Sequence, residues 1–403
     1  MSLNASWAQR FQDAIPFGSS TCSKTAKYAP DEPAVIVRGQ GCRVWDADGR
    51  EFIDFRNSLG PVTLGYRFPA VDEAIRRQLE SGVIFGHPHP LECEVAELIC
   101  QVIPCAQQAR FLKTGGEAVA ACIRIARAIT GRDHVIQIGY NGWLNSLAAG
   151  GRVLPGQVAA AAPPGVPQCL SNLHHACAWN DLPAVEKVFA EHPGQVAALV
   201  VAAAYADMAQ GATFYPALRE ITRKNGALLV FDEIVTGFRI AIGGVQEHFK
   251  VEPDLVVFAK GIANGMPLSV YCGSRETMTA GQKTVVSSTY GGETLSLAAA
   301  KTAIDVYRRQ DVVGHLWRQG EKMWGGLNDI FRRRGVPAEM KGFWPCPQLC
   351  PAADAPAGLY ERVVRAAYRH GVSLYNVCYV NFSHTDADIA EALGRMDQAM
   401  SNL

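Results

Sequence analysis

Residues 254–265 read DLVVFAKGIANG, an apolar run that ends in Lys260 and a glycine-rich turn. Residues 227–233 read ALLVFDE, a second apolar run that ends in Asp232 and Glu233. Short apolar runs of this kind are typical of buried strands. Ligands of open α/β sheets lie at the carboxyl ends of the strands. We therefore expect one crevice that is lined by the amine of Lys260 and the carboxylate of Asp232.

Helical periodicity alternates with short apolar runs from about residue 70 to residue 310. This alternation is typical of βαβ units, in which helices cover both faces of a mostly parallel sheet. The sequence therefore predicts an α/β fold. The runs that we expect to form strands include residues 110–112, 134–138, 196–203, 227–231 and 254–259.

The two flanking segments carry other patterns. Residues 34–55 alternate apolar and polar side chains around Asp48-Gly49, which predicts a β-hairpin or meander with a turn at that dipeptide. The C-terminal segment carries helical patterns near 312–334 and 358–370, then an apolar run at 372–382 and a helix from Asp386.

A chain of 403 residues is long for a single hydrophobic core. We expect a large domain over residues 66–305, which carries the mostly parallel sheet. Residues 1–65 form the N-terminal segment of a smaller lobe, and residues 306–403 form a C-terminal α+β domain.

The composition disfavours several kinds of partner. Lys and Arg equal Asp and Glu at 38 each, so no excess charge is available to hold nucleic acid or an anionic membrane. The apolar stretch 196–205 is too short to span a bilayer. Twelve scattered cysteines, with no targeting pattern over residues 1–15, favour a reducing, cytoplasmic location. Cys346 and Cys350 lack a nearby Cys/His pair, so we expect no metal site.

Residues 110–118, RFLKTGGEA, read as a strand, a glycine turn and the start of a helix. Thr114 and Glu117 have the spacing of a capping box, which alone indicates an ordinary helix N-terminus. Gly115 and Gly116 also leave room for a phosphate to approach the free amides of that helix. The chain has neither the Gly-x-Gly-x-x-Gly pattern nor a Walker lysine motif, which disfavours nucleotide phosphates.

An amine that forms a Schiff base, beside an acid that keeps a pyridine nitrogen protonated, is what pyridoxal phosphate chemistry requires. With the glycine turn added, the chain resembles the class III pyridoxal-phosphate-dependent aminotransferases, in the glutamate-1-semialdehyde aminomutase-like branch. The resemblance extends from about residue 15 to residue 394. The stretches that carry it, in the family's order, are RGQGCRVWDADGREFIDF, LKTGGEAVAACIRIARAITGR, GYNGW, LLVFDEIVTGFR, PDLVVFAKGIANGMPLSVYCG and STYGGETLSLAAA.

The resemblance implies a fold type I transferase that forms a homodimer with shared active sites. It makes Lys260 the Schiff base lysine, which also moves the proton between the substrate carbon and the cofactor. Asp232 is implied to pair with the pyridinium nitrogen. Ile234 and Tyr140 are implied to contact the two faces of the cofactor ring, although either side chain also fits a plain packing role.

The same resemblance assigns the cofactor phosphate to Thr114, Gly115 and Gly116. Thr289 of the other subunit is implied to complete this phosphate site. A plain turn residue is the alternative interpretation of Thr289.

Several positions depart from the family pattern. Gly116 stands where a hydroxyl residue is usual, so one phosphate hydrogen bond is lost unless the charge of Lys113 compensates. Asn141 replaces a histidine, and Ala202-Ala203 replaces a Glu-Pro pair. Residues 284–293 read TVVSSTYGGE and lack the aminomutase's gating run, which argues against the mutase reaction.

Other candidate residues carry weaker signals. Arg239 is either a ligand for a substrate carboxylate or a member of a structural ion pair. His87 and His89 lie in a proline-rich segment that the resemblance places beside the active site, yet the prolines alone explain a rigid loop. His174-His175 is expected to be a solvated loop pair.

The hypothesis that accounts for these residues is an aminotransferase. An amino donor converts pyridoxal phosphate to its pyridoxamine form, which then aminates a small aldehyde or ketone acceptor. An aminomutase, racemase or decarboxylase on the same fold is the first alternative. A non-catalytic binding protein is the second alternative, because accessory positions have changed, although the retention of Lys260 and Asp232 speaks against it.

Overall fold

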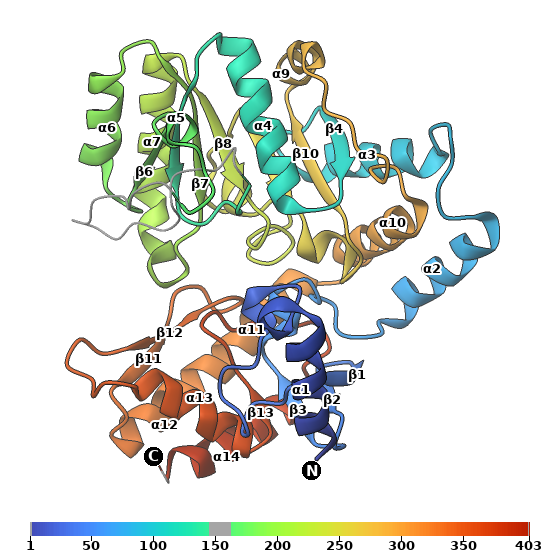
Figure 1. Ribbon diagram of the computed structural model, residues 1–403, viewed down its shortest axis with the longest axis vertical. Helices are drawn as coiled ribbons and strands as arrows, with labels where there is room; N and C mark the ends of the chain where they lie inside the picture. Colours follow the sequence, from blue (N-terminus) through green and yellow to red (C-terminus); the bar gives the residue numbers. More distant parts are fainter. Residues whose placement is uncertain (1, 145–162, 402) are drawn as a thin grey trace. The chain divides into compact units, whose positions relative to one another are not determined.

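The computed structural model describes residues 2–144, 163–401 and 403 (Figure 1). The chain forms two compact units. Residues 70–313 form one, here called the large unit, and residues 1–69 with 314–403 form the other, the small unit. Within the described residues, no helix combines the length and the apolar character that crossing a membrane requires.

A seven-stranded sheet forms the centre of the large unit, in the order β4-β10-β9-β8-β7-β5-β6. Strand β10 runs opposite to the other six strands, so the expected mostly parallel α/β sheet is confirmed. Its strands are β4 (Gln108–Leu112), β5 (His134–Ile138), β6 (His174–Cys177), β7 (Val196–Ala202), β8 (Leu228–Asp232), β9 (Leu255–Phe258) and β10 (Ser269–Gly273).

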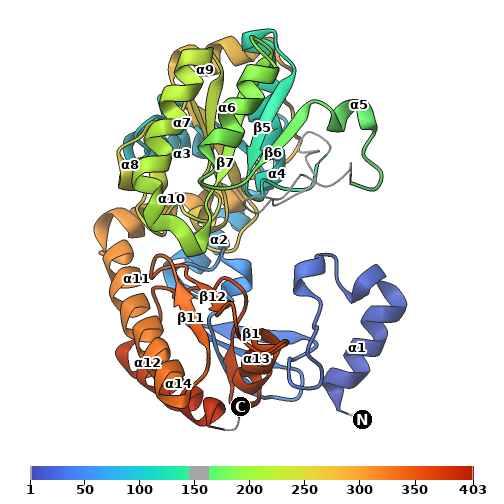
Figure 2. The ribbon, with the colours of Figure 1, turned by 90° about the vertical axis from the view of Figure 1, so that its left-hand side faces the viewer.

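Helices cover both faces of this sheet (Figures 1 and 2). Val230 belongs to the cluster under α4, whereas its neighbour Phe231 contacts Tyr215 of α7 on the opposite face. Successive strand residues point to opposite faces, so a strand covered on both sides is apolar throughout. The helices of the large unit as a whole are α2 (Pro69–Ser81), α3 (Pro90–Val102), α4 (Gly115–Thr130), α5 (Gln168–Ser171), α6 (Leu182–Glu191), α7 (Gly211–Asn225), α8 (Val245–Phe249), α9 (Arg275–Ala280) and α10 (Thr294–Arg309).

The small unit contains the predicted meander. Strands β1 (Ile36–Gln40), β2 (Arg43–Asp46) and β3 (Glu51–Asp54) pair antiparallel in succession, with Asp48-Gly49 in the turn between β2 and β3. The C-terminal strand β13 (Val372–Ser373) adds to β3 in parallel.

The apolar run at 372–382 pairs as a strand only at its first two residues. Among its later residues, Val377 forms an isolated bridge with Gln348. The N–H of Tyr379 donates to the carbonyl of Phe55, and that of Phe382 donates to the carbonyl of Thr63. The core nearby stacks Phe55 on His384 and places Trp324 edge-on to Phe55. The remaining elements are α1 (Leu3–Ala14), α11 (Val312–Gly320), α12 (Gly326–Arg334), β11 (Ala338–Lys341), β12 (Gln348–Pro351), α13 (Leu359–Arg369) and α14 (Asp386–Met400).

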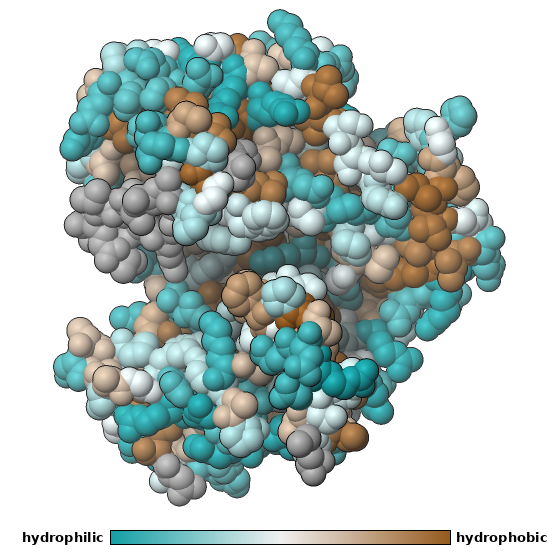
Figure 3. All heavy atoms as spheres, viewed as in Figure 1, coloured by the Kyte–Doolittle hydropathy of each residue, from teal (hydrophilic) through white to brown (hydrophobic). Residues whose placement is uncertain are grey.

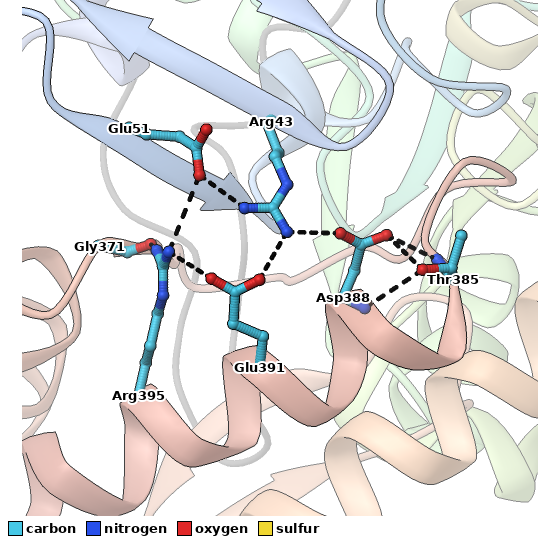
Figure 4. Close-up of polar contacts among 7 residues, drawn as sticks. All are labelled: Arg43, Glu51, Gly371, Thr385, Asp388, Glu391 and Arg395. Carbon is cyan, nitrogen blue, oxygen red and sulfur yellow. Dashed lines mark hydrogen bonds and ion pairs between the residues drawn. The ribbon is translucent and has the colours of Figure 1, made fainter.

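An arginine joins the meander to the last helix (Figure 4). Arg43 of β2 donates to Glu51 of β3 at 2.6 Å, and to Asp388 and Glu391 of α14 at 2.7 Å each. Burial alone would raise the pKa of Asp388, but hydrogen bonds from Thr385 and Arg43 outweigh it and lower the pKa to about 2. The arginine thus holds two segments together that lie 345 residues apart in the sequence.

We expect Arg43→Met to destabilise the protein by roughly 1–3 kcal/mol, since three carboxylates lose a charged donor. An acid with a depressed folded pKa contributes stability above its unfolded pKa, which is lost as pH falls through the folded pKa. The wild type should therefore lose stability between about pH 4 and pH 2, and the variant should lose less over that window. Urea unfolding at several pH values measures both effects. Arg77→Met, which removes an exposed pair with Glu73, is the control and should change stability little.

Candidate active site

Four strand ends meet at the carboxyl edge of the large unit's sheet. Strand β8 ends at Asp232, and the parallel neighbour β9 leads within two residues to Lys260. Strand β4 leads to Thr114, and β5 to Asn141. Because the antiparallel β10 begins at this edge, its Ser269 lies opposite the last residue of β4. The parallel topology thus collects an amine, a carboxylate and a helix N-terminus.

Lys260 has a strained backbone and a half-buried side chain. Its φ is +50°, in the left-handed region that non-glycine residues rarely adopt. Such strain is of order 1–3 kcal/mol and persists where surrounding contacts hold it. The Tyr307 hydroxyl donates to the carbonyl of Gly261 at 3.1 Å and fixes the next residue. Burial lowers the pKa of Lys260 to about 8. The positive charge of Arg239 also lowers this pKa, whereas the negative charge of Asp232 raises it.

Asp232 is buried beside two donors. Its carboxylate accepts from the N–H of Ile234 at 3.1 Å and from the side-chain amide of Asn141 at 3.4 Å. Burial raises the pKa of Asp232 to about 6, although both donors and Lys260 oppose the rise. Asn141 is itself buried, and its side-chain oxygen has no hydrogen-bond partner among the described residues.

The glycine turn has the predicted capping geometry. The Thr114 hydroxyl accepts from the N–H of Glu117 at 3.3 Å, and the Glu117 carboxylate accepts from the N–H of Thr114 at 2.7 Å. The Ser269 hydroxyl donates to the carbonyl of Thr114 at 2.8 Å and fixes the turn from β10. Since α4 begins at Gly115, the N–H groups of Gly115 and Gly116 have no acceptor within the helix.

The two glycines of this turn differ in their surroundings. A Cβ on Gly115 would lie 2.2 Å from Cδ1 of Ile234, whereas a Cβ on Gly116 would meet only ordinary contacts at 3.8 Å. Gly115 is therefore required by the close approach of Ile234. The structure brings Gly115 and Ile234 together, and with them Asp232, which accepts from the Ile234 backbone.

Lys113 is engaged by another group. Its ammonium donates to Glu293 at 2.9 Å. Glu293 caps α10 through the N–H groups of Leu295 and Ser296. In the described structure Lys113 is thus paired with Glu293 at the N-terminus of α10. A phosphate at Gly116 would have to compete with the Glu293 carboxylate for the charge of Lys113.

Glu233 is a buried residue of this edge to which the sequence analysis assigned no role. It accepts from the N–H groups of Val245 and Gln246 at 2.9 and 3.1 Å and from the hydroxyl of Thr236. Burial raises the pKa of Glu233 to about 8, against these three donors. Its contacts tie the loop after Asp232 to α8. The Asp-Glu dipeptide at a strand end was the available signal, but two of the three partners, Val245 and Gln246, lie 12 and 13 residues away.

Two of the expected cofactor residues are exposed in the single chain. Tyr140 is 66% exposed, and Thr289 lies in an exposed turn. Between β5 and Tyr140, Gly139 has a φ of +78°, and a Cβ there would lie 3.1 Å from the carbonyl oxygen of Ala202. The turn that carries Tyr140 thus lies close to Ala202, at a position where the side chain of this chain is small.

The comparisons with known proteins agree with this arrangement. The family description "Aminotransferase class-III" matches residues 25–400. This chain belongs to the class-III aminotransferase family. It is 34% identical to the glutamate-1-semialdehyde 2,1-aminomutase of Gemmatimonas aurantiaca, with 96% of this chain and 93% of the relative covered.

Solved structures of pyridoxal-phosphate enzymes share the fold. An omega-transaminase from Sphaerobacter thermophilus matches with a TM-score of 0.87 and 26% identity, over 99% of this chain and 97% of that one. The pyridoxal phosphate form of the FumI protein from Sphingopyxis sp. MTA144 matches with a TM-score of 0.89 and 25% identity, over 99% and 96%. The expected fold type I and the expected class of enzyme are confirmed, and pyridoxal phosphate is the cofactor of this class-III aminotransferase.

The residues present fit that cofactor. A buried carboxylate, a half-buried amine whose pKa is lowered, and two amides at the start of α4 would suit the ring nitrogen, the aldehyde and the phosphate of pyridoxal phosphate. When bound, the cofactor supplies an electron sink for the carbon that loses its proton.

The weaker candidates have other surroundings. Arg239 is buried and donates through Nε to the carbonyl of Val235 at 3.0 Å. His89 caps α3 by accepting from the N–H of Leu91 at 3.2 Å, as a rigid loop end would, and His87 is exposed.

The expectation of a solvated loop at His174-His175 is wrong. Both residues lie in β6, which pairs with β5. His174 is buried and hydrogen-bonds to Gln137 at 3.0 Å and Arg127 at 3.2 Å. Two adjacent histidines form no apolar run, so the sequence did not predict a strand here. Pairing with β5 and the hydrogen bonds of His174 to Gln137 and Arg127 nevertheless stabilise one.

We expect Gly115→Ala to destabilise this class-III aminotransferase by about 1–3 kcal/mol, because Ile234 must move to admit the methyl group. The adjacent Gly116→Ala should instead raise stability by roughly 0.5–1 kcal/mol, since alanine favours the helix and meets no close contact. Urea unfolding and cofactor retention after dialysis measure both variants. Equal effects of the two substitutions would contradict the contact, and Ile234→Ala should relieve Gly115→Ala.

Proposed function

We propose that this enzyme transfers an amino group from an amino donor to a small aldehyde or ketone acceptor. The observation that carries the proposal is the placement of Asp232 and Lys260 at the ends of adjacent parallel strands, beside the N-terminus of α4. The donor, the acceptor and the roles of individual residues below are parts of the proposal.

In the proposed reaction, Lys260 and Asp232 divide the acid–base work. The pKa of about 8 gives Lys260 a substantial neutral fraction near physiological pH, so Nζ can take the proton from the substrate carbon and return it elsewhere. Asp232 holds a proton at the pyridine nitrogen, and the donors Ile234 N–H and Asn141 orient its carboxylate. Keeping both charges near one another limits the energetic penalty of burying either one.

The remaining roles concern binding. The N–H groups of Gly115 and Gly116, with Thr114, hold the phosphate at the positive end of α4. Ile234 packs on one face of the cofactor ring, in keeping with its contact to Gly115, and Tyr140 covers the other face. An exposed tyrosine is free to change rotamer when ring and substrate arrive.

Transfer between molecules is favoured over the intramolecular mutase reaction by residues 284–293. This stretch, TVVSSTYGGE, lacks the glycine-rich run that the resemblance associates with gating in the aminomutase. The curated relatives at 30–34% identity are aminomutases, which keeps the mutase as the second candidate. A structural neighbour at 26% identity is an omega-transaminase, which supports the first.

We expect the wild type to form a ketone or aldehyde product only when both a donor and an acceptor are supplied. Given glutamate 1-semialdehyde alone, it should yield no isomer with the amino group moved from carbon 2 to carbon 1. Chromatography of the two incubations separates the outcomes. Formation of the isomer at the rate of transamination would assign the mutase, while product from neither incubation would leave both candidates unsupported.

Lys260→Ala should lower kcat by roughly 10²–10⁴-fold, because the proton carrier is removed. Lys224→Ala, at an exposed position of α7, is the control and should retain full activity. Circular dichroism checks that both variants fold. A Lys260→Ala enzyme with wild-type kcat would remove the proposed role.

We also propose that two chains form a homodimer in which Thr289 completes the phosphate site of the neighbour. Large apolar side chains are exposed near the C-terminal end of α2, at Leu79 and Val83–Phe85. Figure 3 shows apolar side chains gathered over α2. Val285 and Tyr290, on either side of Thr289, are also exposed apolar residues. Large exposed apolar areas of this kind mark interaction surfaces.

Mixed dimers test the sharing of sites. We expect Lys260→Ala and Thr289→Asp homodimers to be weakly active, since each site lacks its lysine or meets a carboxylate at the phosphate. A dimer with one subunit of each kind contains one site with Lys260 and an unchanged Thr289, so the mixture should regain activity. Activity assays after co-refolding measure it. No regain beyond the sum of the parents would contradict shared sites.

A further inference from the structure

Three histidines gather at the amino edge of the large unit's sheet. His134 begins β5, His175 is the second residue of β6, and His192 caps the C-terminus of α6. Nδ1 of His134 lies 2.8 Å from Nε2 of His175. The rings lie against one another, with centroids 4.2 Å apart for His134 and His192 and 4.6 Å apart for His175 and His192.

Strands β5, β6 and β8 run in the same direction. His134 and His175 lie at the starts of their strands, whereas Asp232 lies at the end of β8, so the cluster is at the opposite edge of the sheet from Asp232 and Lys260. Strand β6 is one of the two edge strands of the sheet, and α6 packs on it (Figure 1). The three histidines therefore join an edge strand, its neighbour and the covering helix.

Strand geometry explains why these histidines meet. His175 pairs with Ile136, and His134 lies two residues earlier on the same face as Ile136. His174 points to the other face, where it contacts Gln137 and Arg127. The face that carries His134 and His175 is thus the one on which His192 arrives from α6.

The spacing of the ring nitrogens suits a metal ion. One nitrogen of each histidine lies within 4.8 Å of those of the other two. In a tetrahedral zinc site with bonds of about 2.0–2.1 Å, ligand nitrogens are about 3.3 Å apart. The 2.8 Å between Nδ1 of His134 and Nε2 of His175 is shorter than that value and the 4.8 Å limit is longer, so rotations of the half-buried rings would bring all three nitrogens into one coordination sphere.

The local charges are mixed. Burial lowers the pKa of His175 to about 4, with His192 and His134 adding to the lowering, and burial likewise lowers the pKa of His134. Neutral imidazole is the form that binds metal ions. The negative charges of Asp133 near His134 and of Glu191 near His175 favour a bound cation. The positive charge of Arg127 near His134 disfavours one.

We propose that His134, His175 and His192 bind one divalent transition-metal ion, such as Zn²⁺, that fastens the edge strand β6 to α6. Imidazole nitrogen is a preferred ligand of zinc, copper and nickel. Three protein ligands leave the fourth position to water. The expected role is structural, because the catalytic residues lie at the other edge of the sheet.

The test uses the untagged holoenzyme, freed of metal by dialysis against a chelator and then titrated with ZnCl₂ in a calorimeter. We expect one tight site per chain. His175→Gln and His192→Gln should each weaken it at least about tenfold, the lower bound that even outer-shell ligand changes produce. His248→Gln, at an exposed histidine on α8 outside the cluster, is the control and should bind zinc as the wild type does.

A second measurement needs no variant. Zinc should protect His134, His175 and His192 of the wild type from modification by diethyl pyrocarbonate, as mass spectrometry of the peptides reports, while His248 stays reactive. Thermal unfolding should also shift upward with zinc concentration, by mass action on the folded state. Equal zinc affinity in the wild type and the cluster variants, or modification unchanged by zinc, would show a hydrogen-bonded histidine stack only and overturn the proposal.

Discussion

The parallel pairing of β8 with β9 is the constraint on which the candidate site depends. Asp232 pairs with Val257, and the chain beyond β9 then delivers Lys260 at the same edge. A parallel pair places both carboxyl ends together, whereas an antiparallel connection would send the amine and the carboxylate to opposite edges. The βαβ connection through residues 233–254 is therefore a requirement of the chemistry as well as of the fold.

Burial gives this pair its properties. Removing an acid and an amine from water disfavours both charged forms, which raises the pKa of Asp232 and lowers that of Lys260. Their mutual attraction opposes both shifts without cancelling them. Strongly perturbed pKa values of this kind are typical of functional sites, and the positive φ of Lys260 adds a backbone conformation that the surrounding contacts must hold in place.

Local patterns in the sequence predicted the features that depend on neighbours in the chain. Strands β8 and β9 follow from apolar runs, and the box of Thr114 and Glu117 follows from a spacing of three residues. The features that were missed depend on distant partners. Lys113 meets Glu293 across 180 residues, and His134, His175 and His192 meet only once β5, β6 and α6 have packed. No local spacing encodes such encounters.

The departure at Asn141 shows how a changed residue can preserve one property and lose another. The amide of Asn141 still donates to the Asp232 carboxylate, so the orientation of the acid is retained. Unlike the histidine that the family pattern has there, an amide side chain neither gains nor loses a proton at any accessible pH, so it carries no charge. Within the chain, Asp232 is thus held by two neutral donors, the amide of Asn141 and the backbone N–H of Ile234, and Lys260 is the cation that lowers its pKa.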